Sequence, residues 1–215
     1  GQGAYFINGK RIPDSYLPTV HSLTDKTLVY CSYDLTGDIV NGKNKIGVVI
    51  GNDFQTNQAN PYRGNVRMIA QLDITYKDGT AQQIVSNTSW KTADSPILFD
   101  MRRCGEKFDA RLKINGWCDP DFDDSHWDNA FICKGLGGKF RKKIVEPIRI
   151  MRLIRGTEIE KGLFDFGTNT SGWVRINVKG KSGNEIVIKY SENLTDDKRN
   201  VDQTSITNGG THKDQ

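Results

Sequence analysis

Residues 164–174 read Phe164-Asp165-Phe166-Gly167-Thr168-Asn169-Thr170-Ser171-Gly172-Trp173-Val174, and they open the clearest strand pattern in the chain. Apolar and polar residues alternate from Gly172 to Lys179 and again from Glu185 to Ser191, with a glycine-containing turn between the two segments. A period of two places one face of a strand on a core and the other in water. The pattern therefore predicts a β-hairpin made of these two segments.

The same kind of pattern extends toward the N-terminus. A strand or a tight turn is predicted at Asn8-Gly9, Lys45–Ile50, Met68–Tyr76, Asp78-Gly79, Ala81–Val85 and Ile148–Leu153. Only Asp124–Ala130 reads as helical, with an N-cap and about two turns. Many short strands with almost no helix predict an all-β chain built as an antiparallel β-sandwich or jelly roll.

The strand pattern divides the chain near residue 155. Residues 1–155 are predicted to form the first sandwich, and residues 156–215 to begin a second β-domain that is too short to close a core alone. Within the second part, residues 193–215 are mostly polar, which predicts a loop or a disordered tail. An incomplete second domain with an exposed strand edge also predicts self-association.

Composition and charge exclude several classes of partner. The 215 residues carry a net charge of +4, and the only dense basic run, Lys139–Lys143, lacks a nucleic-acid-binding motif. No stretch of 18 apolar residues exists, so no membrane span is expected, and the cellular compartment stays open. Four cysteines (Cys31, Cys104, Cys118 and Cys133) are widely spaced without a C-x-x-C motif, which predicts mostly free thiols.

The known catalytic and cofactor motifs are absent from the sequence, so we expect no catalytic residue, no cofactor and no metal site. The densest acidic cluster is Asp119–Ser125. It fails the calcium-binding EF-hand spacing, because Asp124 and Ala130 stand where a glycine and a glutamate are required. A turn followed by a helix N-cap is the main interpretation, and an irregular calcium site is the alternative.

Sugar-binding surfaces combine aromatic faces with polar groups, because sugar C–H faces stack on rings while hydroxyls need hydrogen bonds. Three residues flanked by glycine, proline or charge fit this description and are the candidate carbohydrate-binding residues: Tyr62, Arg63 and Trp117.

Several motifs together resemble the N-terminal region of bacterial α-L-rhamnosidases. Residues 164–173 resemble the "DFG-x-N-x-x-GW" opening of the second β-domain in that family, and Gly105-Glu106-Lys107-Phe108-Asp109-Ala110-Arg111 resembles its "GE-x-aromatic-DAR" motif. Weaker likenesses are the Asn8-Gly9 hairpin, Tyr33-Asp34-Leu35-Thr36 and Phe122-Asp123-Asp124-Ser125-His126-Trp127. The tryptophan that relatives carry in the loop after Gly51 is missing here.

This resemblance implies a galactose-binding-like jelly roll, then a further β-domain, and then an (α/α) barrel that carries inverting hydrolysis of terminal α-L-rhamnose. The acidic motifs of that barrel have no counterpart in these residues, so the chain is predicted to be a non-catalytic part of such an enzyme, with the barrel as partner and carbohydrate as a further one. The alternatives are a stand-alone carbohydrate-binding module, or the accessory sandwich of another glycosidase such as a β-galactosidase-like enzyme.

Overall fold

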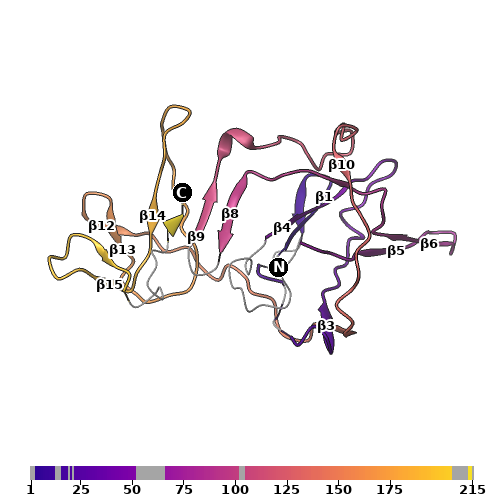
Figure 1. Cartoon of the computed structure of the whole chain (residues 1–215), viewed down its shortest axis with the longest axis horizontal. Coiled ribbons are helices and arrows are strands. Elements are labelled where there is room, and N and C mark those ends of the chain that lie inside the picture. The colour runs from indigo at the N-terminus through magenta and orange to yellow at the C-terminus, as the bar shows by residue number, and fades with distance from the viewer. Residues whose placement is uncertain are drawn as a thin grey trace. The chain divides into compact units, whose positions relative to one another are not determined.

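The computed structural model describes residues 3–12, 16–18, 20, 22–51, 66–101, 105–204 and 213–214. Within this part of the chain, short β-strands and one 3-10 helix form, and there is no α-helix (Figure 1). The all-β fold class is therefore confirmed. No helix among the described residues has the length and apolar character needed to cross a membrane.

The chain divides into two compact units. Unit 1 comprises Gly1–Ser95 and Ile114–Arg149, and unit 2 comprises Pro96–Lys113 and Ile150–Gln215. Unit 2 thus takes in a segment from the middle of the chain besides the C-terminal part. The domain bounds expected from the sequence, 1–155 and 156–215, stay a prediction.

Unit 1 is built on short strands. They are β1 (Gly3–Ile7), β2 (Lys10–Ile12), β3 (Thr27–Tyr30), β4 (Ile46–Ile50), β5 (Gln71–Thr75), β6 (Ala81–Val85), β7 (Lys91–Thr92), β10 (Asp128–Asn129) and β11 (Lys139–Lys142). β1 lies between β2 and β4 in an antiparallel sheet. The pairs β5–β6 and β7–β10 are also antiparallel, while β3 and β11 run parallel.

The Asn8-Gly9 turn joins β1 to β2, as the sequence predicts. Both residues have positive φ, 49° at Asn8 and 77° at Gly9, which is the conformation that this dipeptide favours in tight hairpins. Ile7 and Ile12, at the two sides of the turn, are buried and form part of the described core. The turn therefore fixes the register that brings two core side chains inward.

The hairpin β5–β6 also confirms its prediction. Half-buried and exposed positions alternate along Gln71–Thr75, and Gly79 turns the chain with a φ of 87°. A backbone hydrogen bond closes the turn, in which the Tyr76 N–H donates to the Thr80 carbonyl at 2.8 Å.

Unit 2 consists of short paired strands. They are β8 (Ile97–Met101), β9 (Gly105–Phe108), the 3-10 helix η1 (Ala110–Leu112), β12 (Thr157–Glu160), β13 (Leu163–Asp165), β14 (Ile188–Lys189), β15 (Asn193–Leu194), β16 (Val201–Asp202) and β17 (Lys213–Asp214). The pairs are β8–β9, β12–β13, β14–β17 and β15–β16, all antiparallel. Leu163 is the one large apolar side chain of unit 2 that is buried among the described residues.

The helix predicted at Asp124–Ala130 is wrong. The Asp123 carboxylate accepts the Ser125 N–H at 2.9 Å, and the Trp127 N–H reaches the Asp124 carbonyl at 3.0 Å, which makes a turn only. The next two residues form β10 and pair with β7. Strand pairing with a distant segment therefore ends the helical turn after one bond.

The strand predicted at Ile148–Leu153 is also not formed. Ile148 makes a single antiparallel bridge with Tyr16, and residues 149–153 belong to no strand. Met151 is 89% exposed and Leu153 is 81% exposed. The apolar alternation is present in the sequence, but the described residues supply no neighbouring strand for it.

The hairpin predicted from residues 172–191 is formed only at its turn. The Asn184 N–H donates to the Lys181 carbonyl at 3.0 Å, and Gly183 has a φ of 87°. Residues 172–179 form no strand, and Ile188–Lys189 pairs instead with β17. A two-stranded hairpin with an uncovered apolar face is marginal in water, which explains the absent ladder.

The tail expected to be a loop or disordered holds a short hairpin. β15 and β16 pair through Asn193–Asp202 and Leu194–Val201, and the Thr195 hydroxyl and the Asn200 backbone bond to each other inside the turn. Local side chain to backbone bonds of this kind order polar turns without an apolar core. Sequence hydrophobicity alone therefore underestimated the order of residues 193–204.

Candidate functional site

The loop of residues 115–127 lies against the β1–β2 turn and the start of β4. Trp117 in this loop packs edge-on against Phe6, with ring centroids 5.2 Å apart and planes at 72°. A Cβ added to Gly47 would stand 2.6 Å from Cη2 of Trp117 and 2.8 Å from Sγ of Cys118. Glycine at position 47 therefore makes room for both side chains over β4.

Cys118 fixes the loop from inside the core. Its side chain is 1% exposed, and its thiol donates to the Lys45 carbonyl across 3.6 Å. Burial raises the pKa of the Cys118 thiol, so the group stays protonated at neutral pH. Cys31, Cys118 and Cys133 are free, while Cys104 lies outside the described residues. Cys118 is thus a packing residue rather than a nucleophile.

Asn8 ties the β1–β2 turn to the loop that precedes β4. Its side-chain amide donates to the Asp38 carbonyl at 3.2 Å and to Oδ1 of Asn44 at 2.9 Å. Its side-chain oxygen accepts the Lys45 N–H at 2.9 Å. Each polar group of the Asn8 amide therefore has a partner from a segment more than 29 residues away.

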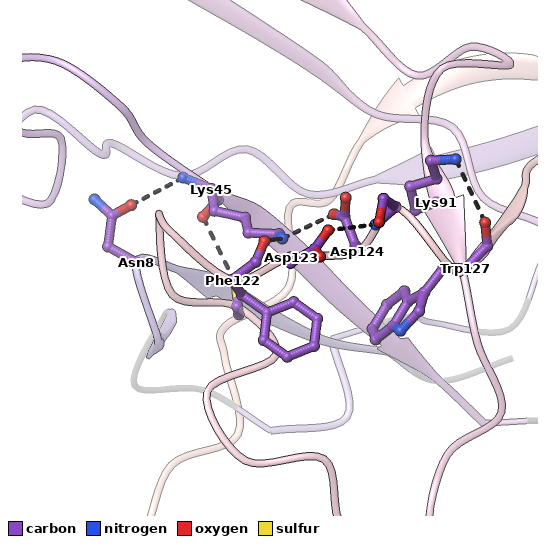
Figure 2. Close-up of polar contacts among 9 residues, drawn as sticks. Asn8, Lys45, Lys91, Phe122, Asp123, Asp124 and Trp127 are labelled. Atoms are coloured by element: carbon purple, nitrogen blue, oxygen red, sulfur yellow. Dashed lines mark hydrogen bonds and ion pairs between the residues drawn. The ribbon is translucent and has the colours of Figure 1, made fainter.

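The Lys45 side chain contacts the loop of residues 115–127, called the acidic loop below, as Figure 2 shows. Its ammonium donates to the Phe122 carbonyl at 3.0 Å and pairs with Oδ2 of Asp124 at 2.8 Å. The same ammonium stands 4.8 Å from the centre of the Phe122 ring, which itself packs edge-on against Trp127. The Lys45 side chain is only 19% exposed, so these contacts are partly shielded from water.

The remaining acids of the loop also have partners. Asp121 pairs with Lys43 at 3.1 Å, and the Asp119 carboxylate faces the two positive-φ glycines Gly9 and Gly116. The Ser125 backbone N–H and hydroxyl lower the pKa of Asp123. Within the part of the chain that the structure describes, no group of three or more metal-ligating side chains converges. Lysines contact Asp121 and Asp124 in this acidic loop, and the Ser125 N–H bonds to Asp123.

A depression of about 680 Å³ in unit 1 is lined by Asn41, Tyr76, Lys77, Asp78 and Thr80. Its one carboxylate, Asp78, accepts the Thr80 hydroxyl at 2.7 Å and the Thr80 N–H at 2.9 Å. These bonds lower the pKa of Asp78, so the group is ionised at neutral pH. The depression therefore lacks the raised carboxyl pKa and the second acid of a glycosidase active site.

The structure describes one of the three candidate sugar-binding residues. Trp117 is half-buried and engaged with Phe6 and Gly47, while Tyr62 and Arg63 lie outside the described residues. A role of these three residues in carbohydrate binding stays a prediction.

The GE-x-aromatic-DAR motif lies in unit 2, where it forms β9 and η1. Gly105 is buried and has a φ of 93°, a conformation that side-chain-bearing residues rarely adopt. The Asp109 carboxylate caps η1 by accepting the Arg111 N–H at 3.0 Å. It also accepts two side-chain hydrogen bonds from Arg111, at 2.9 Å from Nε and at 2.6 Å from Nη2. The motif is therefore a structural corner.

These features define an all-β module whose polar clusters hold loops in place. Residues 1–152 match the α-L-rhamnosidase N-terminal domain, and residues 155–214 match the bacterial α-L-rhamnosidase concanavalin-like domain. The chain belongs to the α-L-rhamnosidase N-terminal domain family, as the motifs at residues 105–111 and 164–173 predict.

Named relatives agree with this assignment. An α-L-rhamnosidase of Formosa agariphila is 29% identical over 98% of this chain, and one of Streptomyces avermitilis is 30% identical over 89% of it. The α-L-rhamnosidase structure from Dictyoglumus thermophilum covers the whole chain with a TM-score of 0.86 and 35% identity. This chain spans only 24%, 20% and 25% of those three proteins, respectively.

We predict that replacing Lys45 destabilises unit 1. Lys45→Met removes a shielded ion pair and the hydrogen bond to the Phe122 carbonyl, so it should lower the free energy of unfolding by about 1–3 kcal/mol. Urea denaturation measures this loss. Lys43→Met is the matched control, because the Lys43–Asp121 pair is 79% and 86% exposed, and it should change stability by less than about 0.5 kcal/mol. Equal effects of both variants would contradict the role of Lys45.

A second prediction concerns Asp109. Hydrogen bonds from the Arg111 side chain lower its pKa to about 2. Because the pKa is lower in the folded state than in the unfolded state, the Asp109 contribution to stability is complete above the unfolded value and is lost as the pH falls toward 2. Carbon-13 NMR of the carboxyl group should give a midpoint near 2. In Arg111→Gln the midpoint should rise toward the ordinary value of about 4; a midpoint near 4 in the unmodified chain refutes the pairing.

Proposed function

We propose that this chain is the non-catalytic N-terminal β-region of an inverting α-L-rhamnosidase, an enzyme that removes terminal α-L-rhamnose from glycans or glycosides. One observation carries the proposal: the family matches run through residues 1–152 and 155–214, and the same region makes up 20–25% of relatives named α-L-rhamnosidase.

The acids of the described residues support a non-catalytic role. Inverting hydrolysis needs a protonated acid and an ionised base, spaced about 6.5–9.5 Å apart so that a water fits between base and sugar. Seven aspartates among the described residues have the opposite property, because hydrogen bonds lower the pKa of Asp34, Asp73, Asp78, Asp109, Asp123, Asp197 and Asp202. Such groups hold no proton for a leaving group at neutral pH.

The partner in this proposal is the catalytic (α/α) barrel of the parent polypeptide. Unit 2 exposes large apolar side chains that a larger assembly would cover, among them Met151 at 89%, Leu153 at 81%, Val178 at 60% and Trp173 at 55%. Covering these side chains would stabilise unit 2, so the work of the chain is structural. Self-association of isolated chains through the same side chains follows from the same exposure.

Carbohydrate contact through Tyr62, Arg63 and Trp117 is a separate part of the proposal. Titrating the chain with L-rhamnose while recording indole NMR signals tests it: a saturable shift of the Trp117 signal that is lost in Tyr62→Ala supports the site. An unchanged Trp117 signal at saturating sugar would contradict the proposed carbohydrate contact. The Trp117 ring would then serve only in packing against Phe6.

We predict a clear division of activity between this chain and the full product of its gene. The 215-residue chain should release no 4-nitrophenol above buffer from an aryl α-L-rhamnoside, because its sequence contains no acid and base motif of such an enzyme. The complete gene product should cleave that substrate with inversion and leave the aryl β-galactoside intact. Turnover by the short chain that a single Asp or Glu substitution abolishes would overturn the non-catalytic role. Cleavage of the galactoside alone would favour the β-galactosidase-like alternative.

A further inference from the structure

Residues 96–113 lie between two segments of unit 1 in the sequence but belong to unit 2. The chain passes from unit 1 to unit 2 after Ser95, comes back at Ile114, and passes to unit 2 again after Arg149. The family match to the N-terminal domain, residues 1–152, includes this whole segment. One hairpin from the first matched region is therefore a structural part of the second unit.

The hairpin of residues 96–113 is closed at its base. The Asp109 N–H donates to the Pro96 carbonyl at 2.9 Å, just outside the β8–β9 pairing of Ile97 with Phe108. The ion pair of Asp109 with Arg111 then fixes the exit through η1. These bonds hold the base and the exit of the hairpin.

The open side of the hairpin meets the C-terminal strands. β17 lies beside β9, and β17 in turn pairs with β14 through Lys213–Lys189 and Asp214–Ile188. Figure 1 shows β8, β9 and β14 in neighbouring positions within unit 2. The hairpin therefore stands beside strands that the concanavalin-like match assigns to the second domain.

Gly105 has a special place in this arrangement. It is buried, it begins β9 opposite Met101, and its φ is 93°. Any larger residue would strain the backbone at that point. The strain would fall on the strand that lies beside β17.

We infer that the β8–β9 hairpin with η1 (residues 96–101 and 105–113) is a docking element for the β14–β17 pair of the concanavalin-like segment, so that the second domain folds on a template supplied by the N-terminal region. The occupant of the docking surface is that segment of the same chain. The inference goes beyond the proposed function, because it holds whichever glycoside the parent enzyme cleaves. It also gives the GE-x-aromatic-DAR motif a role: the motif builds the strand and the corner on which the next domain assembles.

Hydrogen exchange of the 215-residue chain tests the inference with two matched glycine variants. Gly105→Ala strains the docking hairpin, and Gly79→Ala strains the β5–β6 hairpin of unit 1, where φ is 87°. Gly105→Ala should speed amide exchange roughly tenfold or more in residues 97–108 and also in 157–165, 188–189 and 213–214. Gly79→Ala should speed exchange in residues 71–85 and leave unit 2 unchanged.

A second pair of variants tests whether the stability of the β8–β9 hairpin depends on the core of unit 2 or on the core of unit 1. Leu163→Ala, in the buried position of unit 2, should speed exchange in residues 97–108, whereas Ile7→Ala in unit 1 should speed exchange in β1, β2 and β4. The inference is overturned if residues 97–108 respond to Ile7→Ala and not to Leu163→Ala. It is also overturned if Gly105→Ala leaves residues 157–214 unchanged, or if all segments respond alike to every variant.

Discussion

The hydrogen bond from the Lys45 backbone to the side-chain oxygen of Asn8 is the contact on which the described part of unit 1 depends. It brings the start of β4 to the β1–β2 turn, and it directs the Lys45 side chain to the acidic loop. The Phe122 carbonyl and Asp124 then receive the ammonium, so one residue joins three segments. An asparagine suits this position because it tolerates positive φ and offers both a donor and an acceptor.

Packing above β4 depends on the same geometry. Trp117 and Cys118 lie over Gly47, and the loop that carries them is also held by Lys45. In this loop Asp121 and Asp124 pair with lysines, and the Ser125 N–H and hydroxyl lower the pKa of Asp123. These are the conditions of a structural junction, and they are opposite to those of a glycosidase acid, whose pKa must be raised.

Unit 2 follows a different principle. Its described strands are short, its buried apolar side chain is Leu163, and its polar turns are held by local bonds such as that of the Ser191 hydroxyl to the Asp202 carbonyl. The described residues of unit 2 bury little apolar surface, and such a unit gains stability from what it packs against. Its need for packing partners accounts for its exposed apolar residues and for the inclusion of residues 96–113 in unit 2. It also agrees with the larger size of the relatives.

The sequence by itself determined the all-β class, the turns at Asn8-Gly9 and Asp78-Gly79, and the family, because local propensity and short motifs record these properties directly. Tertiary structure alone decided the rest. Asp124–Ala130 became a turn and a strand because β7 was available as a partner. Residues 149–153 belong to no strand, since the described part of the chain offers them no paired neighbour. The Asn8–Lys45 bond and the place of β8–β9 in unit 2 join residues far apart in the chain. Such contacts leave no local pattern to read, since they depend on which distant segment the folded backbone brings near.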